Sequence, residues 1–128
     1  MDAEKTPQAP LRKRRVLVAE KDLAIGLDIR AAVEAADWLV LGPFATAWEA
    51  QDAVASDTPD FALLDVELAD DRSFALAERL QQQGTPFAFV TGRDDLVRDY
   101  GFSGCIVIAK PFSHDAISAV LPGCCETD

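Results

Sequence analysis

Four polar residues each follow a short apolar run, and their types suit one kind of chemistry. Asp65 ends the run Phe61 to Leu64, and the other three are Glu20, Thr91 and Lys110. The carboxyl ends of buried parallel strands lie at one edge of a sheet, so we expect these side chains to meet there. A carboxylate beside an amine and a hydroxyl is suited to carrying a phosphoryl group.

Five apolar runs predict the strands that would position these residues. They cover 15–19, 38–41, 61–64, 87–90 and 105–109, and Gly42-Pro43 is expected to end the second. Helical spacing of apolar residues predicts helices over 22–36, 45–56, 73–83 and 113–121, with Asp22 as an N-cap and Gly84 as a helix end. Asp94 to Gly104 leaves room for about two turns. Trp38 and Trp48 are expected to pack in the core or to be half-buried.

Strands that alternate with helices predict an α/β fold with a doubly wound five-stranded parallel sheet. The length of 128 residues indicates one domain over 15–122, with a disordered arm at 1–14 and a tail at 123–128. A formal net charge of -10 argues against nucleic acid as a partner. The sequence contains no long apolar segment and no secretory signal, so we expect no membrane contact and a cytoplasmic location.

The order of four short motifs resembles that of response-regulator receiver domains. The motifs are Val16-Leu17-Val18-Ala19-Glu20, Leu63-Leu64-Asp65, Val90-Thr91-Gly92 and Lys110-Pro111-Phe112, and the match spans roughly residues 15 to 121. The resemblance implies a flavodoxin-like receiver fold with strand order 2-1-3-4-5. In addition, residues 86–92 resemble the Pro-Phe-x-Phe-Ala-Thr-Gly signature of an alphaproteobacterial subgroup, although Val90 replaces its alanine. That subgroup works with histidine kinases of the HWE and related types.

The same resemblance assigns roles to the residues at the strand ends. Asp65 becomes the phosphoacceptor, Lys110 supplies a positive charge to one phosphoryl oxygen, and Thr91 donates a hydrogen bond to another. The Lys110–Pro111 peptide bond is expected to be cis. Magnesium is expected among the acids, with Glu20, Asp65 and the backbone carbonyl of Glu67 as ligands.

Lys21 departs from the family pattern, because it stands where the family has a second metal-binding acid. Its ammonium could enter the acid pocket and replace part of the charge of the metal. Alternatively it could point to solvent and leave Glu20, with Asp22, to hold the ion more loosely. Both alternatives predict a Mg²⁺ affinity that is weak or absent.

A second departure is Val107, which stands where the family has an aromatic residue that switches between exposed and buried states. The segment from Asp94 to Gly104 is therefore expected to reorder instead, since segments with few buried contacts move at low cost.

The leading interpretation is a single-domain response regulator of a two-component phosphorelay, phosphorylated on Asp65 by a histidine kinase. It would signal by protein–protein interaction or drain phosphoryl groups from its kinase, and it would not be an enzyme in the usual sense. The alternative is a pseudo-receiver that binds partners without phosphorylation because of Lys21. A phosphohydrolase of the haloacid dehalogenase type is a third hypothesis, but those enzymes carry the nucleophile after their first strand.

Overall fold

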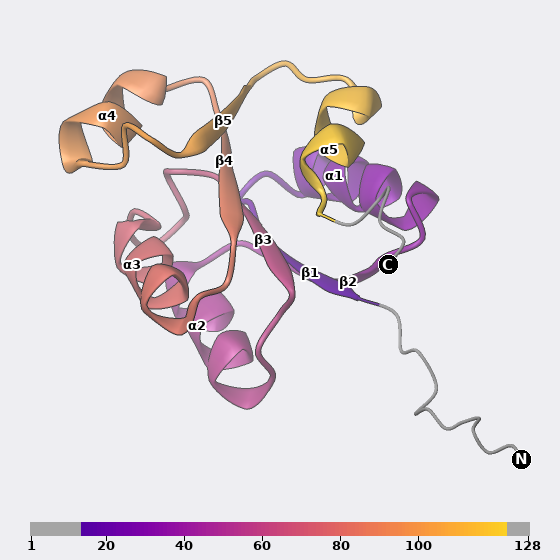
Figure 1. The fold of residues 1–128 in the computed structure, drawn as a ribbon, viewed down its shortest axis with the longest axis horizontal. Helices are drawn as coiled ribbons and strands as arrows, with labels where there is room; N and C mark the ends of the chain where they lie inside the picture. The colour runs from indigo at the N-terminus through magenta and orange to yellow at the C-terminus, as the bar shows by residue number, and fades with distance from the viewer. Residues whose placement is uncertain (1–13, 123–128) are drawn as a thin grey trace, which may run out of the picture.

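The computed structural model describes residues 14–122. The predicted arm, apart from Arg14, and the predicted tail at 123–128 therefore lie outside the described residues. Within them, five strands alternate with five helices (Figure 1). The strands are β1 (Arg15–Ala19), β2 (Leu39–Phe44), β3 (Phe61–Leu64), β4 (Phe87–Thr91) and β5 (Ile106–Ala109), and the helices are α1 (Leu23–Ala35), α2 (Ala47–Ser56), α3 (Phe74–Gln83), α4 (Asp94–Tyr100) and α5 (His114–Val120).

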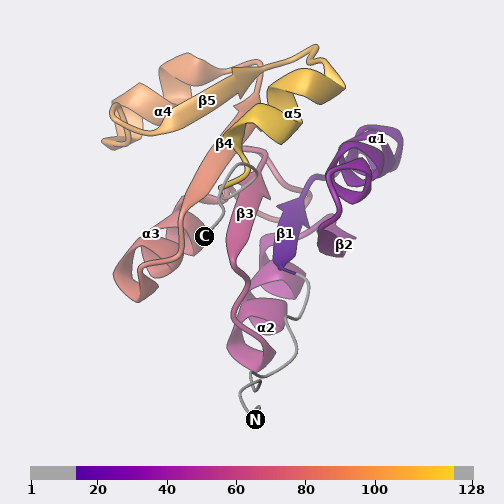
Figure 2. The same cartoon turned by 45° about the vertical axis from the view of Figure 1, so that its right-hand side comes forward.

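All strand pairs are parallel, and the strand order is β2-β1-β3-β4-β5. The predicted doubly wound α/β sheet with the order 2-1-3-4-5 is confirmed. In Figures 1 and 2, α1 and α5 lie on one face of the sheet, and α2 and α3 lie on the other. The central strand β3 is buried along its whole length, as its unbroken apolar run predicts.

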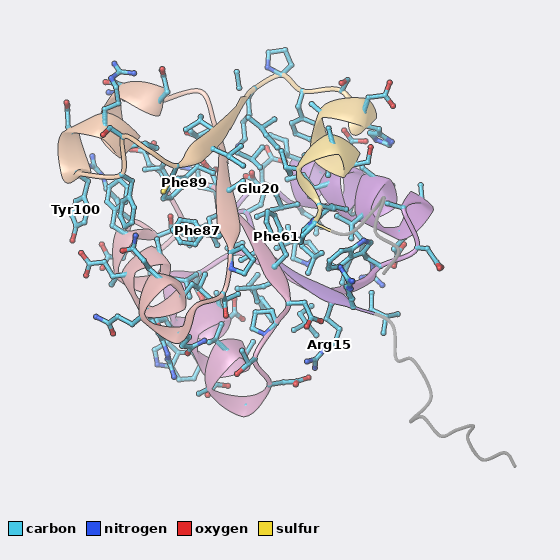
Figure 3. The ribbon with its side chains drawn as sticks, in the orientation of Figure 1. Arg15, Glu20, Phe61, Phe87, Phe89 and Tyr100 are labelled. Atoms are coloured by element: carbon cyan, nitrogen blue, oxygen red, sulfur yellow. The ribbon has the colours of Figure 1, made fainter. Side chains whose placement is uncertain are left out.

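Two apolar clusters fill the space between the sheet and its helices. Alternate side chains of each strand point to opposite faces, so Leu17 and Leu64 contribute to the cluster under α2, α3 and α4, whereas Val18 and Leu63 contribute to the cluster under α1 and α5. Figure 3 shows the same division for aromatic residues, with Phe89 on the α3 side of the sheet and Phe61 toward α5.

The second strand differs from the prediction. We expected Gly42-Pro43 to end it, but β2 continues through both residues to Phe44. Its pairing with β1 is irregular at this point, because the register shifts between Leu17 and Ala19. β2 is an edge strand, and an edge position tolerates a proline that cannot donate a ladder hydrogen bond.

The two tryptophans lie in different environments. Trp38 is 6% exposed, and the guanidinium of Arg14 lies 5.5 Å from the centre of its ring. Trp48, in the first turn of α2, is 70% exposed. The expectation that both would be core or half-buried is therefore wrong for Trp48.

Helix ends follow the predicted signals at several positions. The Asp22 side chain accepts the amide of Ile25 at the start of α1, and Gly84 adopts a left-handed conformation with φ 78° at the end of α3. The Lys110–Pro111 peptide bond is cis, as the resemblance implies. None of the helices within residues 14–122 combines the length and the apolar character that crossing a membrane requires.

Candidate functional site

Sheet register brings the two candidate acids to the same level of the carboxyl edge. Ala19 pairs with Leu64, so the next residues along β1 and β3, Glu20 and Asp65, leave the sheet side by side. The amide of Asp65 also donates to the carbonyl of Ala19 at 2.9 Å. Both side chains are largely covered, with Glu20 2% and Asp65 7% exposed. Figure 3 shows Glu20 near the middle of the molecule, surrounded by other side chains.

Lys110 joins the two acids. Its Nζ donates to Glu20 Oε1 at 2.7 Å and to Asp65 Oδ2 at 3.0 Å. The residue follows β5, and its amide donates to the carbonyl of Thr91 at 3.2 Å. Two carboxylates and one ammonium thus form a compact group drawn from three strand ends.

Glu20 is held at both carboxylate oxygens. Oε1 accepts Lys110 Nζ, and Oε2 accepts the amide of Asp22 at 3.0 Å. Burial raises the pKa of Glu20 above its ordinary value, while the hydrogen bonds from Lys110 and Asp22 oppose the rise and the nearby Asp65 charge adds to it.

The pKa of Lys110 is also raised. Burial disfavours its ammonium, but the hydrogen bonds to Glu20 and Asp65 and the charges of both acids outweigh that effect. Lys110 therefore stays a cation over the physiological range and supplies a fixed positive charge beside the Asp65 carboxylate.

Thr91 lies at the same edge but has a different partner. Its side chain is buried, and its Oγ1 accepts the amide of Arg93 at 3.0 Å. Thr91 and Lys110 line one hollow of about 380 Å³ that extends between α4 and β5. The structure thus brings Glu20, Asp65 and Lys110 into contact and places Thr91 next to the backbone of Lys110.

Lys21 does not take part in the group of acids. Its side chain is exposed and lines a polar hollow with the loop from Glu67 to Arg72. Lys110 fills the position between the two carboxylates that one of our alternatives gave to Lys21. The Asp22 side chain caps α1, where its Oδ1 accepts the amide of Ile25 at 3.2 Å.

No protein-family model matches this sequence, and no curated protein matches it significantly. Solved structures do match. The solution structure of SdrG from Sphingomonas melonis Fr1 aligns with a TM-score of 0.75 and 29% identity, covering 88% of this chain and 96% of that one. The receiver domain of the Erythrobacter litoralis PhyR response regulator aligns with a TM-score of 0.75 and 24% identity over 88% of this chain and 89% of its own. The anti-anti-sigma factor PhyR from Bartonella quintana aligns at 0.70 and 27% identity, over 85% of this chain and 46% of its own.

The chain folds as a response-regulator receiver domain. Its match to SdrG and its match to the PhyR receiver domain each cover 88% of this chain. The resemblance noted from the four motifs is therefore confirmed at the level of the fold.

The loop that follows Asp65 in this receiver domain holds the remaining expected ligand, Glu67. Glu67 pairs with Arg72 as an isolated antiparallel bridge, and their side chains form an ion pair at 3.9 Å. Within residues 14–122 we find no group of three or more acid, cysteine or histidine side chains arranged to hold a metal ion. The weakened Mg²⁺ binding expected from Lys21 stays a prediction.

Val107 of β5 is the residue that the resemblance aligns with a switching aromatic residue. It packs partly buried against the cluster under α3 and α4, and it lines the hollow beside Thr91 and Lys110. At the start of α4, Arg93 forms two hydrogen bonds with the carboxylate of Asp95, each at 3.0 Å.

Two residues with long-range contacts escaped the sequence analysis. Asp70 lies in the loop after Asp65, and its carboxylate accepts the amides of Ala47 and Trp48 at 2.7 and 3.2 Å. Tyr100 stacks on Phe74 of α3 with a centroid distance of 4.2 Å. Both contacts join segments more than twenty residues apart, and periodicity in a single segment carries no signal for them.

Proposed function

We propose that this receiver domain accepts a phosphoryl group on Asp65 from a histidine kinase in the cytoplasm. In that step a carboxylate oxygen of Asp65 bonds to phosphorus, the bond from phosphorus to the kinase histidine nitrogen breaks, and the histidine leaves with its electron pair. The observation that carries this proposal is the ion pair between Asp65 Oδ2 and Lys110 Nζ, at 3.0 Å, at the carboxyl edge of the sheet.

Each neighbouring residue has a part in this proposal. Lys110 neutralises charge on one phosphoryl oxygen, which is where negative charge must be stabilised during transfer. Thr91 donates its hydroxyl hydrogen to another oxygen while its lone pair keeps the amide of Arg93. Glu20 holds Lys110 in place through the bond of 2.7 Å.

We further propose that Mg²⁺ assists with low affinity. Glu20, Asp65 and the Glu67 carbonyl would hold it, and Mg²⁺ commonly accepts only one or two protein carboxylates while keeping its waters. A bound ion supplies positive charge to the transferring oxygens. Because Lys110 already pairs with both acids and Lys21 replaces an acid, the ion meets less negative charge here than three free carboxylates would offer.

The kinase partner we propose is of the HWE or a related type. The support is the segment Pro86 to Gly92, most of which forms β4, together with the structural match to PhyR and SdrG. The downstream effect is either binding to another protein or withdrawal of phosphoryl groups from the kinase. The match to a PhyR described as an anti-anti-sigma factor supports the first of these, signalling through protein–protein interaction.

The test is phosphorylation by acetyl phosphate with Mg²⁺ and by a panel of HWE-type kinases, followed by intact mass. We expect a gain of one phosphoryl group in the wild type and none in Asp65→Ala. Asp52→Ala, which changes an exposed acid of α2, is the matched control and should be phosphorylated like the wild type. A wild type without a mass gain from any donor would contradict the proposal.

That contrary result would favour the second candidate, a pseudo-receiver that binds partners without phosphorylation. One observation supports it, because Lys110 pairs with both Glu20 and Asp65 and so supplies positive charge to the acids from the protein itself. A pseudo-receiver should bind its partner equally well as wild type and as Asp65→Ala.

A further inference from the structure

The loop between Asp65 and α3 is ordered by its own hydrogen bonds. The amide of Leu68 donates to the carbonyl of Asp71 at 3.0 Å, and the amide of Ser73 donates to the carbonyl of Val66 at 2.9 Å. Together with the bridge between Glu67 and Arg72, these bonds make residues 66–73 a small hairpin, which we call the acceptor hairpin. It begins one residue after Asp65 and includes the Glu67 carbonyl.

The tip of the acceptor hairpin is fastened to another part of the chain. The amide of Ala69 donates to the carbonyl of Ala45 at 2.9 Å. Asp70 adds its carboxylate, whose Oδ1 accepts the amide of Ala47 at 2.7 Å and whose Oδ2 accepts that of Trp48 at 3.2 Å. These amides, that of Ala47 first, hold the pKa of Asp70 below its ordinary value. Asp70 therefore stays ionised and accepts hydrogen bonds from the amides at the start of α2, which have no partner within the helix.

The helix itself does not require Asp70 as its cap. Thr46 already occupies the N-cap position of α2, where its hydroxyl oxygen accepts the amide of Glu49 at 3.0 Å. Asp70 is thus a second cap from a segment more than twenty residues away along the chain. What distinguishes Asp70 from Thr46 is that it joins the tip of the acceptor hairpin to the start of α2.

We infer that Asp70 is a positioning residue for phosphoryl acceptance, because it fastens the acceptor hairpin, and with it the Glu67 carbonyl beside Asp65, to the N-terminus of α2. This inference rests on the proposed function. Groups that orient a ligand from behind commonly change affinity or activity about 10- to 100-fold when they are removed. The same contacts act in the other direction, so a movement of the acceptor hairpin should change the start of α2.

The test compares two caps of one helix. Asp70→Ala removes the cap that also holds the acceptor hairpin, whereas Thr46→Ala removes the cap that serves α2 alone. Both variants should have lower midpoints of thermal unfolding. We expect the initial rate of phosphorylation by acetyl phosphate at fixed Mg²⁺ to fall about ten-fold in Asp70→Ala and to stay close to wild type in Thr46→Ala.

A second readout does not depend on phosphorylation. Amide hydrogen exchange of Leu68 and Ser73 should quicken in Asp70→Ala and should be unchanged in Thr46→Ala. Asp70→Asn keeps an oxygen that can accept one helix amide, so it should restore most of the rate and the protection.

Three outcomes would overturn the inference: equal phosphorylation rates in Asp70→Ala and Thr46→Ala, unchanged exchange of Leu68 and Ser73 in Asp70→Ala, or a loss in Asp70→Asn as large as in Asp70→Ala. A wild type that takes no phosphoryl group overturns the proposed function itself. A phosphorylated wild type whose variants behave alike overturns the positioning role alone.

Discussion

Two buried carboxylates, Glu20 and Asp65, share the ammonium of Lys110 at the carboxyl edge of the sheet, so Lys110→Met tests the electrostatics of the site directly. Without Lys110, Glu20 and Asp65 would face each other unpaired, and we expect the free energy of unfolding to fall by about 3 kcal/mol near neutral pH. The difference in the free energy of unfolding between wild type and Lys110→Met should shrink in acid, because a protonated Glu20 needs no cation. The raised pKa of Glu20 places this recovery above pH 4.5.

The wild type should show a complementary loss at high pH. The folded-state pKa of Lys110 is raised above 10.5, so its contribution to stability is complete below that pH and is lost as the pH rises through the folded value. Urea unfolding across pH should show this alkaline phase in the wild type only. If the free energy of unfolding depended on pH identically in wild type and Lys110→Met, both the acid recovery and the alkaline loss would be contradicted.

Lys21→Asp tests whether Lys21 weakens the binding of Mg²⁺. The change restores an acid next to Glu20, and we expect tighter Mg²⁺ binding because carboxylate oxygens are its preferred protein ligands. Titration of Mg²⁺ against wild type and variant measures the change, and Lys21→Met separates the gain of an acid from the loss of a cation. Equal affinities in wild type and Lys21→Asp would show that Lys21 does not weaken the site.

At this scale, sequence reasoning was strong where a residue ends a strand. The run ends at Glu20, Asp65 and Lys110 predicted a shared edge, and the structure joins them with two hydrogen bonds. It was weak for Lys21, because the direction of a long side chain depends on space that adjacent loops leave. The role of Asp70 could not be predicted for a similar reason, since its hydrogen-bond partners lie in α2, far away along the chain.

At the level of elements, the packing of α1 on β2 depends on Gly26. A Cβ added there would lie 2.8 Å from Pro43 Cβ and 2.9 Å from Pro43 Cγ. The proline ring cannot swing aside, so Gly26→Ala should lower the free energy of unfolding by about 1–3 kcal/mol. In contrast, Gly104→Ala meets nothing within 4 Å and should stay within about 0.5 kcal/mol of wild type. Chemical denaturation measures both, and a neutral Gly26→Ala would show that the helix can shift.

The α4 segment is held in place by aromatic and apolar contacts. Tyr100 stacks on Phe74 at 4.2 Å and on Phe102 at 5.8 Å, and Val97 is buried. Reordering on phosphorylation, which stays a prediction for residues 94–104, is therefore expected at the Arg93 end, next to Thr91. Unchanged hydrogen exchange there with a phosphoryl mimic would argue against it.

Tyr100→Ala should loosen the anchored end. Stacked aromatic pairs contribute about 0.5–1.5 kcal/mol beyond their buried area, so exchange of α4 amides should quicken about two- to ten-fold. Tyr100→Phe keeps the ring and serves as the control with near-normal exchange. Equal protection in all three proteins would mean that the Tyr100 ring does not anchor the helix.

The sequence also predicted most elements to within a few residues, since apolar periodicity is a local property. The end of β2 is the exception. Gly-Pro usually stops a strand, but here the strand lies at the sheet edge and pairs irregularly with β1, so it continues to Phe44. Edge position is a property of the assembled sheet and cannot be read from residues 38–44 alone.

For the whole molecule, charge is the dominant surface property. Acidic residues number 22 against 12 basic ones, which gives a formal net charge of -10. Like charges on a small folded protein repel, and salt screens this repulsion over about 10 Å at 0.1 M. We therefore expect the thermal midpoint to rise with sodium chloride between about 10 and 200 mM. A midpoint that falls with salt would show that attractive ion pairs, such as those of Arg93 and Arg98, outweigh the repulsion.

One contact near the start of β1 bears on how this domain can be engineered. Arg14 Nη1 donates to the carbonyl of Pro122 at 3.0 Å, so the chain enters the first strand and leaves the last helix at nearly the same place. The strands run from that place toward the carboxyl edge of the sheet, and α5 runs back from that edge. A short bridge from Pro122 to Arg14 would therefore permit circular permutation, and a fluorescent protein or affinity handle joined at either position would sit at the opposite end of the molecule from Asp65.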